Sequence, residues 1–287
     1  MAAFLERTQK LRQHIEALIR RDAAKRSLAV DGERCGAAWT TEVVEAAQKK
    51  QGDGKRCVCI GLSCPQGGGK TTASMYMQEA LALMGKKCAV MSLDDVYWKY
   101  EQQVALAKAT QPIHCFRCAY RGNPGTMDVP LLMDVVHECK TSTGEIALPR
   151  YDKSQHNGRG DRVPVSDVHM KAVNKELRAL DKFYEELDGL VVIKIDNLDW
   201  VYEWREQPEQ LLREAKKPAM TPDEVRDFVD RFMPAYKTYL KELYAADPKE
   251  STSPLAKVPR LIFSITSARE PAGKPMEFNF TSEALKD

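Results

Sequence analysis

The sequence lacks any long run of apolar residues, and no stretch approaches the roughly 20 residues that a bilayer-spanning helix needs. Its first residues, MAAFLERTQKLRQHIEALIRR, also lack the apolar core of a secretory signal, because acidic residues occur among apolar residues at helical spacing. The same acidic residues are atypical of a transit peptide. We therefore expect a cytoplasmic protein that does not associate with a membrane.

An excess of either charge is also absent. The chain has 43 lysines and arginines against 41 acidic residues, which gives a formal net charge of +2. A strongly basic chain would indicate nucleic acid or an anionic membrane as a partner, so we expect neither. Any basic site must therefore be local. The oligomeric state leaves no signal in the sequence.

The eight cysteines are scattered and show no regular spacing. Cys57, Cys59 and Cys88 lie inside apolar runs, where a reduced cysteine behaves as a small apolar residue, and this favours a reducing, cytosolic setting. Cys115 and Cys118 form one C-x-x-C pair, but the second pair that a zinc ribbon needs does not follow. We interpret these two as ordinary thiols.

Short apolar runs alternate with longer stretches of helical periodicity. The apolar runs predict buried strands of a parallel sheet, over residues 57–63, 88–95, 190–196 and 260–267. The periodic stretches predict helices, over residues 39–50, 71–85, 173–189 and 221–243. In the last of them, Thr221 and Glu224 have the spacing of a capping box, and Pro234 is expected to kink or end the helix. This alternation predicts an α/β fold with a parallel sheet wrapped by helices.

The stretch GLSCPQGGGKTTASM, residues 61–75, lies between the first predicted strand and the first long helix. In a phosphate-binding loop, glycines free successive main-chain N–H groups to converge on an anion at a helix N-terminus. Lys70 would then reach the β- and γ-phosphates of ATP, and the Thr71 hydroxyl would bind Mg²⁺. The residues expected to hold the nucleotide are Gln66, Gly67, Gly68, Gly69, Lys70, Thr71 and Thr72. Cys64 stands where the strict G-x-x-x-x-G-K-[ST] pattern has its first glycine.

Two carboxylates, Asp94 and Asp95, end the second predicted strand. Neighbouring strands of an open parallel sheet end at the same edge, so these side chains are expected to face the phosphate loop. A small-molecule kinase needs one carboxylate to accept the proton of the acceptor hydroxyl and another to help hold Mg²⁺. We assign Asp94 as the base and Asp95 as its helper, both near the metal. The competing interpretation is that both residues only cap a helix.

Several longer segments together resemble the D-glycerate 3-kinase family, whose plant, fungal and yeast members belong to the phosphoribulokinase/uridine kinase group of phosphate-loop proteins. They are GLSCPQGGGKTT, SLDDVYW, RGNPGTMD, LPRYDKSQHNGRGDR and KIDNLDWVYEWR, and they run in order from about residue 55 to 270. The resemblance implies that ATP with Mg²⁺ phosphorylates a small hydroxy acid, D-glycerate. It also implies that the helix beginning near Tyr202 is a lid, whose Arg205 closes over the ATP phosphates.

The resemblance places the acceptor substrate among charged residues of a glycine-rich excursion, over residues 100–165, that holds no long apolar element. Arginine grips carboxylates at two points, which suits the carboxylate of glycerate. Without the resemblance, these residues would equally suit a solvated loop. The implied substrate-binding residues are Arg117, Arg121, Asp128, Arg150, Lys153, Arg159, Asp161 and Arg162.

One segment of the family is missing. The family carries a valine- and isoleucine-rich strand that ends in Glu-Gly-Trp after the GRGDR motif, but here Arg162 is followed by VPVSDVHMKAVNKELRAL. Residues 190–196 would bring Asp196 near Mg²⁺ if they replaced that strand, although they match a later strand better. The loss leaves a gap beside the phosphate loop unless neighbouring strands close it.

From these patterns we divide the chain into a helical extension (1–54), a phosphate-loop kinase-like domain (55–270) and a loosely ordered tail (271–287). The leading functional hypothesis is an ATP-dependent D-glycerate kinase. A nucleotide-binding relative with impaired catalysis is the second, and a kinase for a nucleoside, pantothenate or another sugar acid is the third. A GTPase is disfavoured, because no N-K-x-D run for base recognition occurs.

Overall fold

The computed structural model describes residues 13, 30–50, 57–109, 126–142, 146, 148–149, 151, 180–245 and 254–280. Contacts within the chain divide it into two compact units, residues 1–90 with 187–287, and residues 91–186. The three-part division expected from the sequence stays a prediction. None of the described helices combines the length and the apolar composition that a membrane crossing requires.

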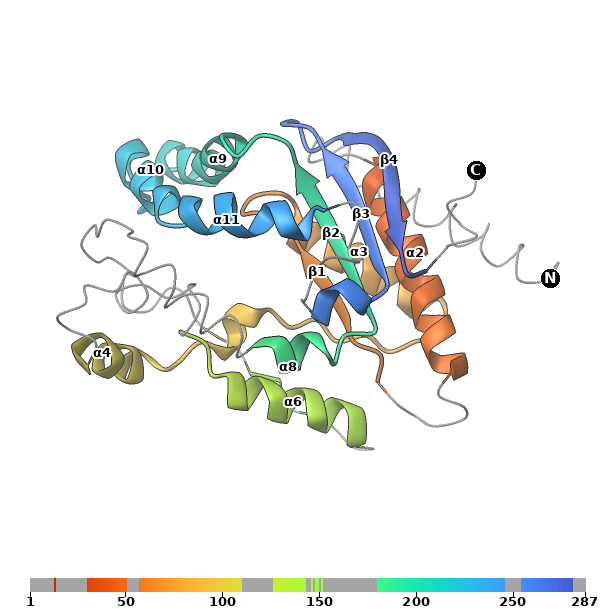
Figure 1. The fold of residues 1–287 in the computed structure, drawn as a ribbon. Coiled ribbons are helices and arrows are strands. Elements are labelled where there is room, and N and C mark those ends of the chain that lie inside the picture. Colours follow the sequence, from red (N-terminus) through yellow and green to blue (C-terminus); the bar gives the residue numbers. More distant parts are fainter. Residues whose placement is uncertain are drawn as a thin grey trace. The chain divides into compact units, whose positions relative to one another are not determined.

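The first unit is built on a four-stranded sheet in the order β1 (Ile60–Ser63), β2 (Gly189–Ile195), β3 (Arg260–Ile265) and β4 (Pro271–Phe278) (Figure 1). The first three strands are parallel, and the predicted α/β class is confirmed. The sheet is not wholly parallel, however, because β4 runs antiparallel to β3. We expected a loosely ordered tail after residue 270. This expectation is wrong for residues 271–278, because the chain turns back there and pairs with β3.

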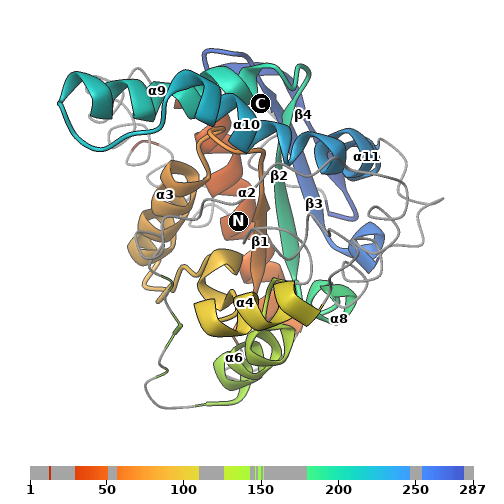
Figure 2. The ribbon, with the colours of Figure 1, turned by 90° about the vertical axis from the view of Figure 1, so that its left-hand side faces the viewer.

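Strand β2 is buried on both faces, which explains its nearly continuous apolar sequence. On one face, Val191 and Ile193 pack into a cluster with Trp39 of helix α2 (Val30–Lys50) and Ala80 of helix α3 (Lys70–Leu83). These two helices lie side by side (Figure 2). On the other face, Val192 packs with Ile262 of β3, with Val258 just before that strand and with Leu243 at the end of the preceding helix.

Residues 88–95 do not form the strand that their apolar sequence predicts. Residues 86–92 belong to no strand, and Leu93–Val96 form a 3-10 helix, η1. A strand exists only through ladder hydrogen bonds to a neighbour. The sheet order begins with β1, so among the described residues β1 is an edge strand. We attribute the wrong prediction to the missing Glu-Gly-Trp strand, the element with which such a run would pair.

Three helices follow β2 in the same unit, namely α9 (Trp200–Glu214), α10 (Pro222–Asp230) and α11 (Met233–Leu243). The predicted capping box is confirmed, since the Thr221 hydroxyl accepts from the Glu224 N–H (3.3 Å) and the Glu224 carboxylate accepts from the Thr221 N–H (2.9 Å). The predicted break is also confirmed, because Pro234 lies in the first turn of α11 and a new helix begins there. A short 3-10 helix, η4 (Pro254–Lys257), then leads into β3.

The second unit contains η1 and three described α-helices, α4 (Tyr100–Ala109), α6 (Val129–Thr141) and α8 (Asp181–Tyr184). The expectation that residues 100–165 hold no long apolar element is wrong at α6, which buries Leu132, Val135 and Val136. Its start signal is an N-cap aspartate followed by a proline in the first turn. Of the helix predicted over residues 173–189, only residues from 180 on are described, and they form α8 and a turn.

Candidate functional site

The predicted phosphate loop connects β1 directly to α3, in the strand–loop–helix context that the motif requires. Gly67 and Gly69 have φ angles of 79° and 96°, which few other residues adopt. Gly69 is the residue immediately before α3, so Lys70 opens the first turn of that helix. The main-chain N–H groups that α3 leaves without helical partners therefore lie where the loop ends.

Gly67 and Gly68 are also required by close packing. A Cβ atom on Gly67 would lie 2.5 Å from the Cβ of Trp204, and one on Gly68 would lie 2.2 Å from the Sγ of Cys64. Cys64, the departure from the strict pattern, thus occupies space that a side chain at position 68 would fill. Burial raises the pKa of the Cys64 thiol to about 11, although the charges of Lys70 and Arg269 lower it. Cys64 therefore stays a neutral thiol at pH 7.

Lys70 lies across the loop that precedes it. Its ammonium group donates to the carbonyl oxygens of Cys64 and Pro65, the latter at 3.1 Å. These bonds hold a positive charge at the mouth of the loop, where a phosphate would replace the carbonyls. The next residue, Thr71, is exposed, and its hydroxyl makes no hydrogen bond to any other described residue. This free hydroxyl fits the ligand that Mg²⁺ needs beside a bound phosphate.

Two side chains from distant parts of the chain hold the loop in place. The Gln66 N–H donates to the hydroxyl oxygen of Tyr236 in α11 (3.3 Å), and Arg269 Nε donates to the Gly67 carbonyl (2.7 Å). Burial raises the pKa of Tyr236 to about 12, so this hydroxyl stays neutral. Neither residue belongs to a motif in the sequence. No motif spacing relates them to the loop, and only the fold brings them to it.

Arg205, expected to close over the ATP phosphates, is held within the helical pair α9–α10. Its guanidinium pairs with Glu209 (2.7 Å) and lies 5.4 Å from the ring centre of Phe228. Glu209 is 7% exposed and accepts from the Met220 N–H (2.8 Å). Burial alone would raise the pKa of Glu209, but the bond from Met220 and the charges of Arg205 and Arg213 outweigh it and keep that pKa below the ordinary value.

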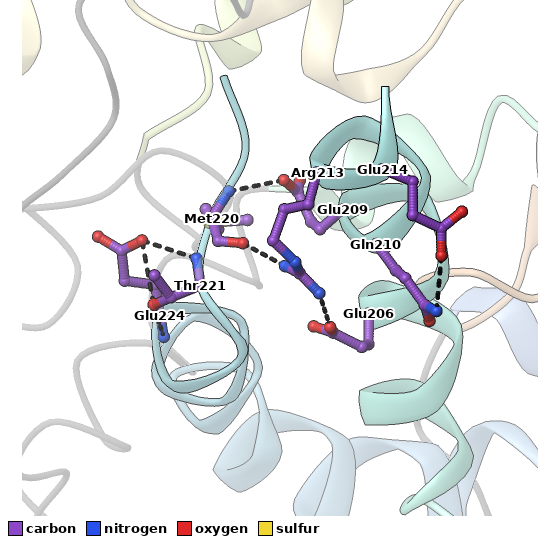
Figure 3. A network of polar contacts seen from close by, with 8 residues as sticks. All are labelled: Glu206, Glu209, Gln210, Arg213, Glu214, Met220, Thr221 and Glu224. Atoms are coloured by element: carbon purple, nitrogen blue, oxygen red, sulfur yellow. Dashed lines mark hydrogen bonds and ion pairs between the residues drawn. The ribbon is translucent and has the colours of Figure 1, made fainter. Parts of the chain in front are cut away.

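Glu209 also belongs to a polar network between α9 and the start of α10, together with Glu206, Arg213 and Met220 (Figure 3). Arg213 pairs with Glu206, which lies two helical turns before it in α9, and also donates to the Met220 carbonyl. Met220 is thus bound through both its N–H and its carbonyl, which fixes the connection between the two helices. Arg205 is anchored at the edge of this network through Glu209.

In the second unit, Asp94 and Asp95 make different contacts. Asp95 completes a capping box at η1, since its carboxylate accepts from the Ser92 N–H (2.9 Å), and it also accepts from the Tyr151 N–H (3.1 Å). The carboxylate of Asp94 accepts a hydrogen bond from the Tyr97 hydroxyl. The ring of Tyr97 meets that of Tyr151 edge-on, with centres 5.3 Å apart. The capping interpretation therefore describes Asp95, whereas Asp94 is held by a side chain.

Among the residues implied as substrate-binding, Asp128 is described, and its carboxylate accepts from the Leu131 N–H (3.0 Å) as the N-cap of α6. Whether the carboxylates of the second unit meet the phosphate loop stays a prediction. The other implied residues lie outside the described ones, namely Arg117, Arg121, Arg150, Lys153, Arg159, Asp161 and Arg162.

Asp196, the alternative metal-site residue, follows β2, and β2 pairs directly with the phosphate-loop strand through Ser63 and Val192. Its side chain is 63% exposed and lies 3.5 Å from the ammonium of Lys194. Among the described residues, no three histidine, cysteine or acidic side chains gather as a preformed metal site.

Comparisons with known proteins found kinases. No family model matches the chain. The chain is 35% identical over 238 residues to the chloroplastic D-glycerate 3-kinase of Arabidopsis thaliana, a match that covers 70% of this chain and 52% of that protein. It is 30% identical over 247 residues to the probable ATP-dependent kinase TDA10 of Saccharomyces cerevisiae, covering 84% of it. It is also 28% identical to the uncharacterized kinase mug58 of Schizosaccharomyces pombe, covering 88% of it.

Two solved structures share the fold. The structure of the YGR205w protein matches with a TM-score of 0.69 and 27% identity, over 84% of this chain and 98% of that one. A D-glycerate 3-kinase from Cryptococcus neoformans matches with a TM-score of 0.70 and 22% identity, over 86% of this chain and 99% of that one. The second likeness bears on the fold alone. The chain spans about half the length of the Arabidopsis relative.

Proposed function

Because the chain belongs to the D-glycerate 3-kinase family, we propose that it is an ATP-dependent kinase that transfers the γ-phosphate of ATP to D-glycerate. The observation that carries the proposal is the loop at Gly67–Gly69, whose left-handed glycines lead straight into the first turn of α3 with Lys70 across them. Such a loop presents several N–H donors and one ammonium to a chain of phosphates.

In this proposal, the residues from Gln66 to Thr72 hold the ATP phosphates. The Lys70 ammonium gives up its hydrogen bonds to the Cys64 and Pro65 carbonyls and binds the β- and γ-phosphates instead. There it offsets the negative charge that develops during phosphate transfer. The free hydroxyl of Thr71 takes a magnesium ion, with help from Asp94 and Asp95. The ion neutralises phosphate charge when bound.

The acceptor is a small hydroxy acid. D-glycerate binds among the cationic residues of the excursion between residues 117 and 162, with Asp128 and Asp161 orienting those cations. Asp94 accepts the proton of the hydroxyl as it attacks the γ-phosphate in line, and Arg205 helps to spread the charge once it leaves Glu209. Tyr97 holds the Asp94 carboxylate in one orientation. The described cysteines are free thiols, which supports the cytoplasm as the compartment.

The test is release of ADP from MgATP with D-glycerate as the acceptor, and with uridine and pantothenate as alternative acceptors in parallel. Of the three acceptors, we expect only D-glycerate to support turnover, and we expect Asp94→Ala and Lys70→Met to lose it. Turnover with uridine or pantothenate instead would contradict the assigned acceptor and favour the related kinases of that group.

A second candidate is a relative that binds ATP without transferring phosphate. The position of β1 at the edge of the sheet favours it, because the strand that would carry another acidic residue beside the loop is missing from the sequence. Calorimetry separates the two candidates. If calorimetry shows that MgATP binds but none of the three acceptors leads to ADP release, this second candidate is favoured over the kinase.

A further inference from the structure

Arg269 has a backbone conformation that its residue type rarely adopts. It lies in the tight turn between β3 and β4, where its N–H donates to the Thr266 carbonyl (2.9 Å) and the Thr266 N–H donates to the Glu270 carbonyl (2.7 Å). Its φ angle is 63°, in the left-handed region, and hairpins of this kind normally place glycine there. A side chain at such a position is energetically unfavourable, because its Cβ approaches the neighbouring carbonyl oxygen. An arginine in this turn therefore needs a reason outside it.

The side chain of Arg269 connects three elements that carry the candidate site. Its Nε donates to the Gly67 carbonyl (2.7 Å), and its NH2 group donates to Gln207 Oε1 of helix α9 (2.7 Å). Its guanidinium lies 5.0 Å from the ring centre of Trp204, also in α9. Trp204 in turn donates its indole N–H to the Ser267 carbonyl of the turn (2.7 Å). The turn, the loop and α9 are thus fastened at one point.

The bond to Gly67 fixes the direction of a peptide group inside the phosphate loop. In a planar trans peptide, the carbonyl of one residue and the N–H of the next point in opposite directions. While Arg269 holds the Gly67 carbonyl, the Gly68 N–H points into the loop, where it makes only a long bond to the Pro65 carbonyl (3.3 Å). Glycine on both sides makes the opposite orientation accessible, and that orientation would turn a carbonyl oxygen toward the phosphates.

We propose that Arg269 is a positioning residue of the nucleotide site. It keeps the Gly67–Gly68 peptide oriented for phosphate and couples this orientation to α9 through Gln207 and Trp204. The backbone strain at Arg269 is the cost of placing a forked donor at this spot. This inference rests on the proposed nucleotide-binding function and adds a residue that neither the loop motif nor the family segments contain.

The experiment compares four proteins by calorimetry with MgATP and by thermal unfolding: the wild type, Arg269→Gly, Arg269→Lys and Lys216→Gly. Arg269→Gly suits the left-handed φ but removes both donors. Arg269→Lys keeps the charge without the fork. Lys216→Gly is the matched control, because Lys216 is an exposed residue with a φ of 55° just after the end of α9.

We expect the dissociation constant for MgATP to rise about tenfold in Arg269→Gly, which is the effect of losing a charged hydrogen bond. The unfolding midpoint should stay within about 5 °C of the wild type. Arg269→Lys should recover only part of the affinity, and Lys216→Gly should bind as the wild type does. Unchanged affinity in Arg269→Gly, or full recovery in Arg269→Lys, would overturn the inference.

Loss of affinity together with a larger fall in the midpoint would also overturn it, because Arg269 would then serve the fold as a whole. The wild type separates this inference from the proposed function. A wild type that binds no MgATP contradicts the function itself, whereas a wild type that binds, with Arg269→Gly binding equally well, contradicts the role of Arg269 alone.

Discussion

The phosphate loop of the first unit and the Ser92–Tyr97 turn of the second both supply candidate site residues, but they are held in different ways. The loop is fixed by residues far away in the chain, Tyr236 and Arg269. The turn is fixed mainly by its own neighbours, since Asp95 bonds to Ser92 and Asp94 to Tyr97. A region that must present many N–H groups at once needs external support, whereas a single carboxylate can be oriented by one nearby hydroxyl. Substitutions in the loop should therefore affect nucleotide binding, and those in the turn should affect turnover or local stability.

A large effect on turnover is expected at Lys70. Replacing it by methionine removes the ammonium that crosses the loop and leaves the Cys64 and Pro65 carbonyls facing the incoming phosphates. Loss of one such electrostatic donor costs about 10²–10³-fold in turnover. ADP release in the presence of D-glycerate measures it, with calorimetry of MgATP on the same protein. Unchanged turnover would show that this loop does not hold the nucleotide.

Asp94→Asn and Asp95→Asn test the division of labour within the turn. Asp94→Asn should lower turnover by about 10²–10⁴-fold, the range for loss of a general base, while MgATP binding changes little. Asp95→Asn should weaken the capping box of η1, at about 1 kcal/mol, and should lower turnover less than Asp94→Asn, because Asp95 only assists in holding Mg²⁺. Turnover and urea unfolding, measured on both variants, give the comparison. If Asp95→Asn loses as much turnover as Asp94→Asn, the two carboxylates do not have separate roles.

Gly68→Ala tests whether packing inside the loop limits its shape. The added Cβ would meet Cys64 Sγ at 2.2 Å, so we expect overpacking of about 1–3 kcal/mol and weaker MgATP binding. Adding Cys64→Gly removes the obstructing sulfur and should restore most of the binding. Calorimetry on the single and double variants measures this recovery. A double variant that binds no better than Gly68→Ala would mean that the other neighbours of the added Cβ, the Pro65 carbonyl at 3.4 Å and the Trp204 ring at 3.5 Å, set the requirement.

At Glu209 of α9 we expect an effect on the free energy of unfolding. Its pKa is held below the ordinary value of 4.5, so its ionised form stabilises the fold above pH 4.5, and this contribution is lost as the pH falls through the lowered pKa. Glu209→Gln should cost about 1–3 kcal/mol of unfolding free energy at pH 7. Urea unfolding at pH 7 and pH 3 measures it. The difference between wild type and variant should shrink at pH 3, and an equal difference at both values would contradict the assignment.

Much of the first unit could be predicted from the sequence, because its signals are local. The glycines and Lys70 indicated the loop. The Thr221 capping box marked the start of α10, and Pro234 marked the break before α11. The prediction of a strand over residues 88–95 was wrong, because an apolar run does not show whether a neighbouring strand exists to pair with it. Helix α6 was not predicted, although Asp128 and the proline that follows it form a recognisable helix start.

The sequence by itself determined which residues form the phosphate loop and which family the chain resembles, since both depend on short, contiguous patterns. Only the tertiary structure decided that the residues after β3 turn back as β4, that β1 lies at the edge among the described strands, and that Arg269 holds the Gly67 carbonyl. The physical reason is separation along the chain. Gly67 and Arg269 are 202 residues apart, and folding alone brings an arginine fork from one to the carbonyl of the other.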